Sequence, residues 1–64
     1  MKMFKRICIE SFAVKNESGD LLICERGEEH FTSDVCENGT IILIYETIAV
    51  PEKYFAGAIE IPYV

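Results

Sequence analysis

A single dipeptide, Asn38-Gly39, restricts the fold of this chain more than any other local feature, because it lies between two segments rich in β-branched and apolar residues. Both central positions of a type I′ turn need left-handed backbone, and Asn followed by Gly tolerates that conformation best. With these two residues as the loop, Cys36 is expected to pair with Ile41, and Thr32 with Tyr45. The sequence therefore predicts a β-hairpin with a testable register.

The remaining strand signals are short segments of alternating or continuous apolar residues. Residues 5–14 alternate between two residue sets and predict one first strand, whereas residues 21–24 form a continuous apolar run, typical of a strand buried on both faces. Residues 41–45 are apolar on both faces and are expected at the centre of the sheet, with the more polar residues 31–36 near an edge. Residues 59–61 alternate again and predict a last short strand.

Three further turns separate these segments. The polar cluster at residues 16–20 contains Gly19, which supplies the positive φ of a tight reversal, and residues 26–29 predict a second reversal. Proline suits the first position of a helical turn, so one short turn of helix is expected from Pro51 to Phe55. No segment repeats apolar residues at helical spacing, and a longer helix is therefore not expected.

The length of the chain sets the size of its core. A chain of 64 residues buries only about 60% of the surface that its unfolded form exposes, so one small core is all that it can build. We therefore expect residues 1–64 to form a single all-β (mainly β) domain of five to six short antiparallel strands with one helical turn. Strands this short close most economically as a small barrel or as two orthogonally packed sheets.

The run from Ile48 to Phe55, with Pro51 inside it and a strand after it, resembles the strand, helical turn and strand that end SH3-like barrels. The sequence also resembles small SH3-like proteins of unassigned function that phages and prophages of Gram-positive bacteria encode. The resemblance implies an SH3-like barrel. Because the chain has no Trp and nothing that matches the paired aromatic residues of peptide-binding SH3 domains, recognition of proline-rich peptides is not expected.

The charge balance limits the class of partner. Eleven acidic side chains against six basic ones give a net charge of −5, which repels phosphate and disfavours direct binding to DNA or RNA. The start of the chain is basic, whereas the middle, from Glu25 to Glu37, is acidic with Arg26 alone to offset it. If the partner is recognised electrostatically, we expect a protein with a basic surface.

The candidate protein-binding residues are the acidic side chains of this middle region and one tyrosine. Tyrosine is enriched at protein interfaces, and Tyr54 and Tyr63 are the aromatic residues expected at the surface, while most others are expected in the core. The predicted binding residues are Glu25, Glu28, Glu29, Asp34, Glu37 and Tyr54.

Metal binding and catalysis are not expected. Cys8, Cys24, His30 and Cys36 offer four zinc-ligand side chains, but no two cysteines have the close paired spacing of structural zinc sites. The three cysteines are instead expected as free thiols in the core, and His30 at a solvated turn. Nucleophilic catalysis needs a base beside the nucleophile, and His30 is the only histidine that could act as that base. The four glycines are isolated in the sequence and form no phosphate-binding loop. The sequence therefore predicts no enzyme, no metal and no cofactor.

The start of the chain bears on its location. The segment from Met1 to Arg6 has the charge of a signal-peptide n-region, but Glu10 cuts the apolar stretch that follows after three residues. No segment approaches the roughly 18 apolar residues that span a bilayer. We therefore expect no secretion signal and no membrane association, and the predicted location is the cytoplasm.

Together these observations predict a small acidic protein-interaction module, an inhibitor or adaptor encoded by a mobile element, that binds a basic surface of a host protein. The alternative is a structural building block that forms homo-oligomers through an exposed edge strand and has no separate target. The apolar ending at residues 59–64, together with a small core, motivates that alternative.

Overall fold

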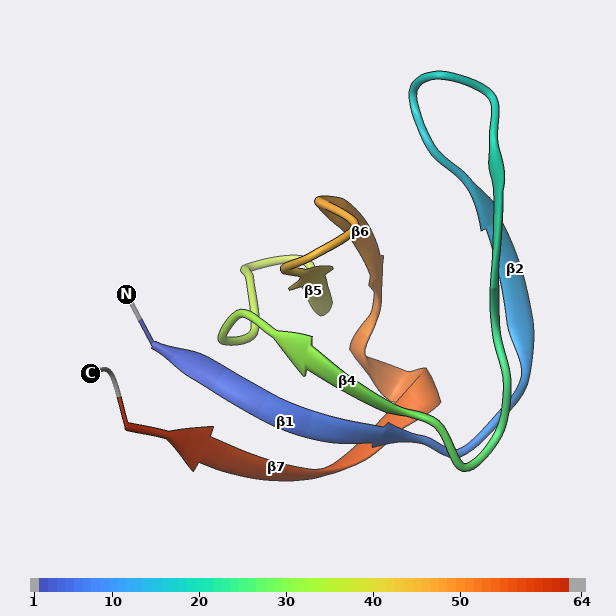
Figure 1. Ribbon diagram of the computed structural model, residues 1–64. Helices are drawn as coiled ribbons and strands as arrows, with labels where there is room; N and C mark the ends of the chain where they lie inside the picture. The colour runs from blue at the N-terminus through green and yellow to red at the C-terminus, as the bar shows by residue number, and fades with distance from the viewer. Residues whose placement is uncertain (1, 63–64) are drawn as a thin grey trace.

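The computed structural model describes residues 2–62, and these residues form a mainly β protein with one 3-10 turn and no α-helix among them (Figure 1). The mainly β prediction is confirmed, although the described residues form more strands than expected. The elements are β1 Met3–Cys8, β2 Phe12–Lys15, β3 Leu21–Cys24, β4 Glu29–Thr32, β5 Thr40–Leu43, β6 Ile48–Pro51, the 3-10 turn η1 Glu52–Tyr54 and β7 Phe55–Ile61.

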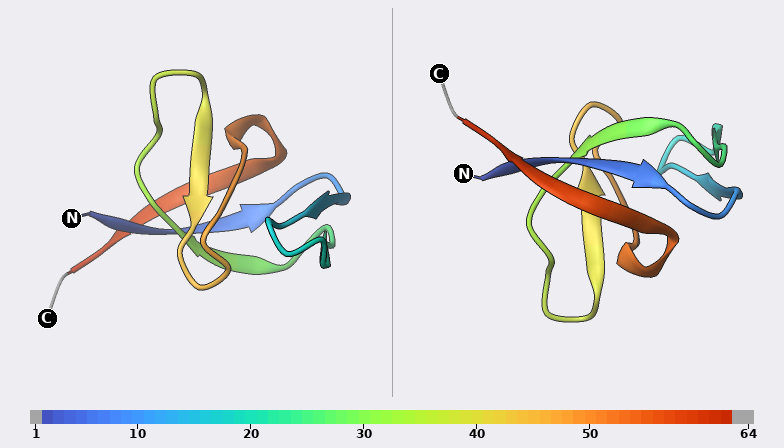
Figure 2. Two further views of the ribbon diagram at one scale, coloured as in Figure 1. Left: turned by 90° about the horizontal axis from the view of Figure 1, so that it is seen from above. Right: turned by 90° about the horizontal axis from the view of Figure 1, so that it is seen from below.

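Five strands form one antiparallel sheet in the order β6-β5-β4-β1-β7, and β2 and β3 form a separate hairpin. In Figure 2, β5 runs across the direction of β1 and β7, so the sheet is strongly twisted. The predicted closure into a barrel is wrong: within residues 2–62, β6 and β7 remain the two edges of the sheet. β2 and β3 pair with each other and do not extend the five-stranded sheet.

The first strand is shorter than predicted, because residues 5–14 divide into β1 and β2. At the end of β1, the N–H of Cys8 donates to the C=O of Glu28 (2.9 Å), and the N–H of Gly27 donates to the C=O of Cys8 (2.7 Å). The N–H of Ile9 then donates to the C=O of Tyr54 (2.9 Å). These bonds end the β1 ladder and redirect the chain into the hairpin.

The β2–β3 hairpin closes at the predicted turn. The N–H of Gly19 donates to the C=O of Asn16 (3.0 Å), and Gly19 has a φ of 87°, so the predicted role of this glycine is confirmed. The expectation that residues 21–24 are buried on both faces is wrong. Leu21 and Ile23 are exposed whereas Cys24 is fully buried, because the hairpin packs against the core with one face only.

A hairpin does connect β4 and β5, but its predicted register is wrong: Thr32 pairs with Leu43 and not with Tyr45. The N–H of Gly39 donates to the C=O of Cys36 (3.1 Å), and the N–H of Cys36 donates to the C=O of Thr40 (2.8 Å). The loop therefore has three residues. Gly39 alone has a positive φ, 74°, which is the arrangement of a type I turn followed by a glycine bulge.

The positions of two strands in the sheet also differ from expectation. β4 lies at the centre of the sheet rather than near an edge, and β5 lies between β6 and β4. β5 ends at Leu43, because the N–H of Thr47 donates to the C=O of Leu43 (2.7 Å) and closes a turn there. Tyr45 lies in that turn and is exposed, although the sequence placed it in a buried strand.

The core is a cluster of six buried apolar residues between the sheet, the hairpin and η1. Cys8 and Cys24 belong to it as predicted, but Cys36 is exposed because it begins the β4–β5 turn. The helical turn after Pro51 is confirmed as η1, and β7 begins directly after it, four residues earlier than the predicted last strand. The buried apolar residues are Cys8, Cys24, Ile41, Leu43, Val50 and Phe55.

Candidate functional site

The structure divides the predicted acidic residues between the two ends of β4. Glu25 and Glu28 lie in the turn before β4, and Glu29 begins the strand. Asp34 and Glu37 lie beyond its other end, in the connection to β5 (Figure 2). The acidic middle of the sequence is therefore not one surface, and the two parts have to be considered separately.

Glu25 and Glu28 are held together by the β3–β4 turn. The N–H of Glu28 donates to the C=O of Glu25 (3.1 Å), and the N–H of Glu25 donates to Oε1 of Glu28 (2.6 Å). Gly27 has a φ of 94°, which lets the chain reverse within four residues. The turn thus holds the Glu28 carboxylate against the backbone of Glu25, and both residues are exposed.

Residues 9–11 lie against this turn and add a third carboxylate. The N–H of Arg26 donates to Oγ of Ser11 (2.9 Å), which supplements the bond from Gly27 to Cys8. Glu10 is exposed, and Ile9 beside it keeps 48% of its surface exposed. We call the group Ile9, Glu10, Glu25 and Glu28 the acidic end.

Sequence reasoning missed two members of the acidic end. Ile9 and Glu10 were assigned to the middle of a first strand, and only the break between β1 and β2 brings them beside the β3–β4 turn. The signal available in the sequence was Glu10 itself, a charged residue that interrupts the apolar alternation. Arg26 lies in the same turn between Glu25 and Glu28, so this part of the chain carries three acidic side chains and one arginine.

Of the other predicted acidic residues, Glu29 and Asp34 have local partners. Glu29 forms an ion pair with Nζ of Lys5 (3.2 Å), an exposed contact of the kind that contributes little to stability. Oδ1 of Asp34 accepts from the N–H of Val35 (2.8 Å), so Asp34 stabilises its own loop. Glu37 lies in the β4–β5 turn.

Tyr54 is a packing residue of η1 rather than a free side chain. Its ring stacks on Phe12, with 4.8 Å between the ring centroids, and Nζ of Lys53 lies 5.4 Å from the same ring. Tyr54 is partly buried against the core. Tyr63, the other tyrosine expected at the surface, lies outside the described residues.

His30 does not lie at a solvated turn as predicted. It belongs to β4, is largely buried, and packs edge-on against Phe55 with ring centroids 5.9 Å apart. Its Nε2 atom has no hydrogen-bond partner and lies 3.6 Å from Oε1 of Glu28. The imidazole therefore lies between the Glu28 carboxylate of the acidic end and Phe55 of the core.

A buried arginine pairs across the sheet with His30 and was also missed by the sequence reasoning. Arg6 keeps only 4% of its surface exposed, and its Nε donates to Oγ1 of Thr32 (2.8 Å). Nη1 of Arg6 lies 3.7 Å from Oε1 of Glu52, and the guanidinium lies 5.4 Å from the ring of Phe4. The contacts of Arg6 thus link η1 to β1 and β4 at the centre of the sheet.

Within residues 2–62, no three His, Cys, Asp or Glu side chains lie close enough together to hold a metal ion. Burial raises the pKa of the Cys24 thiol to about 11, and negative charge on Cys8, Glu28 and Glu46 adds to the shift. The folded protein therefore keeps this thiol protonated.

The raised pKa of Cys24 predicts a loss of stability in alkali. The thiol has an ordinary pKa of 9.0, so the unfolded chain releases this proton at lower pH than the folded protein. Its contribution to the free energy of unfolding is intact below about pH 9 and falls by up to about 3 kcal/mol as the pH rises toward 11. Urea denaturation from pH 8 to 11 measures this effect. The free energy of unfolding of the wild type should approach that of Cys24→Ala as the pH rises. Parallel pH curves for the two proteins would contradict this expectation.

An open cleft lies between the tip of the β2–β3 hairpin and the turn before β6. It has a volume of about 410 Å³ and is lined by Asn16, Glu17, Glu46 and Thr47, among other residues. No helix in the described part of the chain is long and apolar enough to cross a membrane. No protein-family model, no curated protein and no solved structure matches the chain.

Proposed function

We propose that this chain is a small cytoplasmic protein-interaction module whose acidic end docks onto a basic surface of a host protein. It acts by binding and not by catalysis, as an inhibitor or adaptor encoded by a mobile element. The observation that carries the proposal is the hydrogen bonding of residues 8–11 to the β3–β4 turn, which brings the segment with the exposed Ile9 and Glu10 against the turn that carries Glu25 and Glu28.

An SH3-like architecture is part of the proposal. The first strand, β1, pairs with the last strand, β7, and η1 stands between β6 and β7. β4 is the other neighbour of β1 in the sheet, and the hairpin of β2 and β3 lies between these two strands in the sequence. These features support an opened relative of an SH3-like barrel, with the acidic end beside the junction of the hairpin and the sheet.

The chemistry of the acidic end favours a basic protein over other partners. Charges at the rim of an interface accelerate encounter and select partners of opposite charge, while a desolvated apolar residue supplies affinity. The exposed Ile9, next to Glu10 in the chain, provides such an apolar anchor. The backbone hydrogen bonds around it reduce the conformational entropy that binding would otherwise cost.

The proposal is tested by affinity capture from nuclease-treated bacterial lysate with three tagged baits. These are the wild type, an acidic-end variant (Glu10→Gln, Glu25→Gln, Glu28→Gln), and a control variant at the hairpin tip and the β5–β6 turn (Glu17→Gln, Asp20→Asn, Glu46→Gln). Both variants lose three negative charges, and glutamine retains the acceptor that Glu28 offers to Glu25.

We expect wild type and control to capture the same protein in near-stoichiometric amount, and the acidic-end variant to capture it at least about tenfold less well. Equal loss in both variants would mean that only net charge matters, and equal capture by all three would remove the acidic end from the interface. Either result would overturn the proposal, as would recovery of the bait alone.

A further inference from the structure

The outer face of the five-stranded sheet is apolar and uncovered. Along β1, Arg6 and Cys8 point into the core, so the alternating residues Lys5 and Ile7 point outward. The strand register places further side chains on the same face, because Ile59 and Phe31 flank Lys5 on the two sides of β1. The outer sheet face therefore crosses β7, β1 and β4 as a continuous surface.

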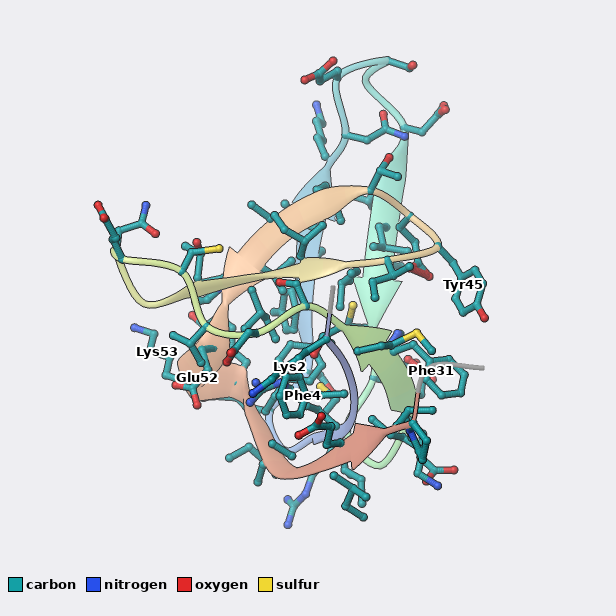
Figure 3. The ribbon with its side chains drawn as sticks, turned by 90° about the vertical axis from the view of Figure 1, so that its left-hand side faces the viewer. Lys2, Phe4, Phe31, Tyr45, Glu52 and Lys53 are labelled. Atoms are coloured by element: carbon teal, nitrogen blue, oxygen red, sulfur yellow. The ribbon has the colours of Figure 1, made fainter. Side chains whose placement is uncertain are left out.

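Aromatic residues extend this surface toward β5. The rings of Phe31 and Tyr45 meet edge to face with 5.7 Å between their centroids, and Figure 3 shows them together on the side of the molecule away from Glu52 and Lys53. Met3 pairs with Ile61 one step further along the sheet. We define the outer sheet face as Met3, Ile7, Phe31, Tyr45, Ile59 and Ile61, with the ion pair of Lys5 and Glu29 among them.

The exposed surface is slightly larger than that of a typical monomer and includes large apolar side chains. The chain exposes 4531 Å², whereas about 4,200 Å² is typical of a folded monomer of its 7.3 kDa mass. Ile59 is 58% exposed, and Tyr45 more so. A contiguous apolar face of this kind on a small acidic protein is characteristic of an interaction site.

The charge on the outer sheet face identifies the occupant. Lys5 and Glu29 lie on it as an ion pair of 3.2 Å, so the face is neutral although the chain carries a net charge of −5. In a face-to-face pair related by a two-fold axis in the plane of the face, Lys5 of each copy would approach Glu29 of the other, so the surface can be complementary to itself. A second copy also supplies the burial that a core of six residues lacks.

From this geometry we propose that two copies of the chain associate face to face through the outer sheet face, with sheets about 10 Å apart. The face lies on three strands and one aromatic turn, so the interface falls at the small end of the range for protein complexes. The dimer is accordingly weak and forms only at high protein concentration. The outer sheet face shares no residue with the acidic end. The dimer and the proposed binding function can therefore be refuted independently of each other.

Sedimentation equilibrium over about 5–500 µM tests the dimer. The wild type should approach twice its 7.3 kDa mass at the upper concentrations, whereas Ile59→Lys should remain monomeric, with association weakened at least about tenfold. Leu21→Lys is the matched control, because Leu21 on the hairpin is also 58% exposed and the charge change is the same. Circular dichroism confirms that each protein is folded before it is compared.

The control should dimerise like the wild type. A wild-type protein that stays at monomer mass at 500 µM would overturn the proposal. A dimer that Leu21→Lys disrupts as fully as Ile59→Lys would place the interface on the hairpin or show a general effect of charge, and would overturn it as well.

Discussion

Replacing Leu43 by alanine is expected to remove a large share of the protein's stability at 25 °C. Leu43 is fully buried in β5, where it pairs with Thr32 on one side and with Ile48 on the other. Removing a buried leucine side chain costs about 2–5 kcal/mol, because apolar burial is lost and a cavity remains. A domain of this length has a total stability of only about 3–10 kcal/mol.

Urea denaturation followed by circular dichroism measures this effect. Leu43→Ala should lower the free energy of unfolding by about 3 kcal/mol, whereas the exposed Leu21→Ala should lower it by less than about 0.5 kcal/mol. Similar losses for the two variants would show that Leu43 does not lie in the core described above.

Replacing Arg6 by alanine is expected to have the second largest effect. The guanidinium is almost fully buried, and its contacts with Thr32, Glu52 and Phe4 join β1, β4 and η1. Breaking a fully buried ion pair costs about 3–5 kcal/mol, but Glu52 is 41% exposed and water compensates part of that loss. We therefore expect Arg6→Ala to destabilise the protein by about 2–3 kcal/mol.

Two further variants separate charge from packing at this position. Arg6→Met keeps most of the side-chain volume and should recover about half of the lost stability, and Glu52→Gln should cost less than about 1 kcal/mol because Glu52 is partly solvated. Thermal unfolding resolves these differences, since 1 kcal/mol shifts the midpoint by roughly 4–8 °C in a domain of this size. An unchanged midpoint in Arg6→Ala would contradict the description of the cluster.

The turns were the most predictable part of this fold. The positions of Gly19 and Gly27 identified two reversals correctly, because each has a positive φ that other residues rarely adopt. The hairpin at Gly39 was also found, but its register was not. A three-residue loop with a glycine bulge and a two-residue loop both suit Asn-Gly, and the choice between them depends on tertiary packing.

Sheet order and barrel closure could not be read from local patterns. The break between β1 and β2 arises from backbone bonds to Gly27, Glu28 and Tyr54, which lie 18 or more residues away along the chain. That break also creates the acidic end, so only Glu25 and Glu28 of the site were predicted. Arg6 was missed because a charged residue in a strand is usually solvated, and its burial depends on Thr32 and Glu52.

The central claim is that the acidic end is the binding surface, and backbone amide NMR tests it most directly. Uniformly ¹⁵N-labelled protein is titrated with the partner recovered by affinity capture, at a protein concentration low enough to keep the labelled chain monomeric. We expect the largest shifts or line broadening at Ile9, Glu10, Glu25, Arg26 and Glu28. The claim is contradicted if these amides stay unperturbed while those of the outer sheet face, around Ile59 and Phe31, or of the hairpin tip respond.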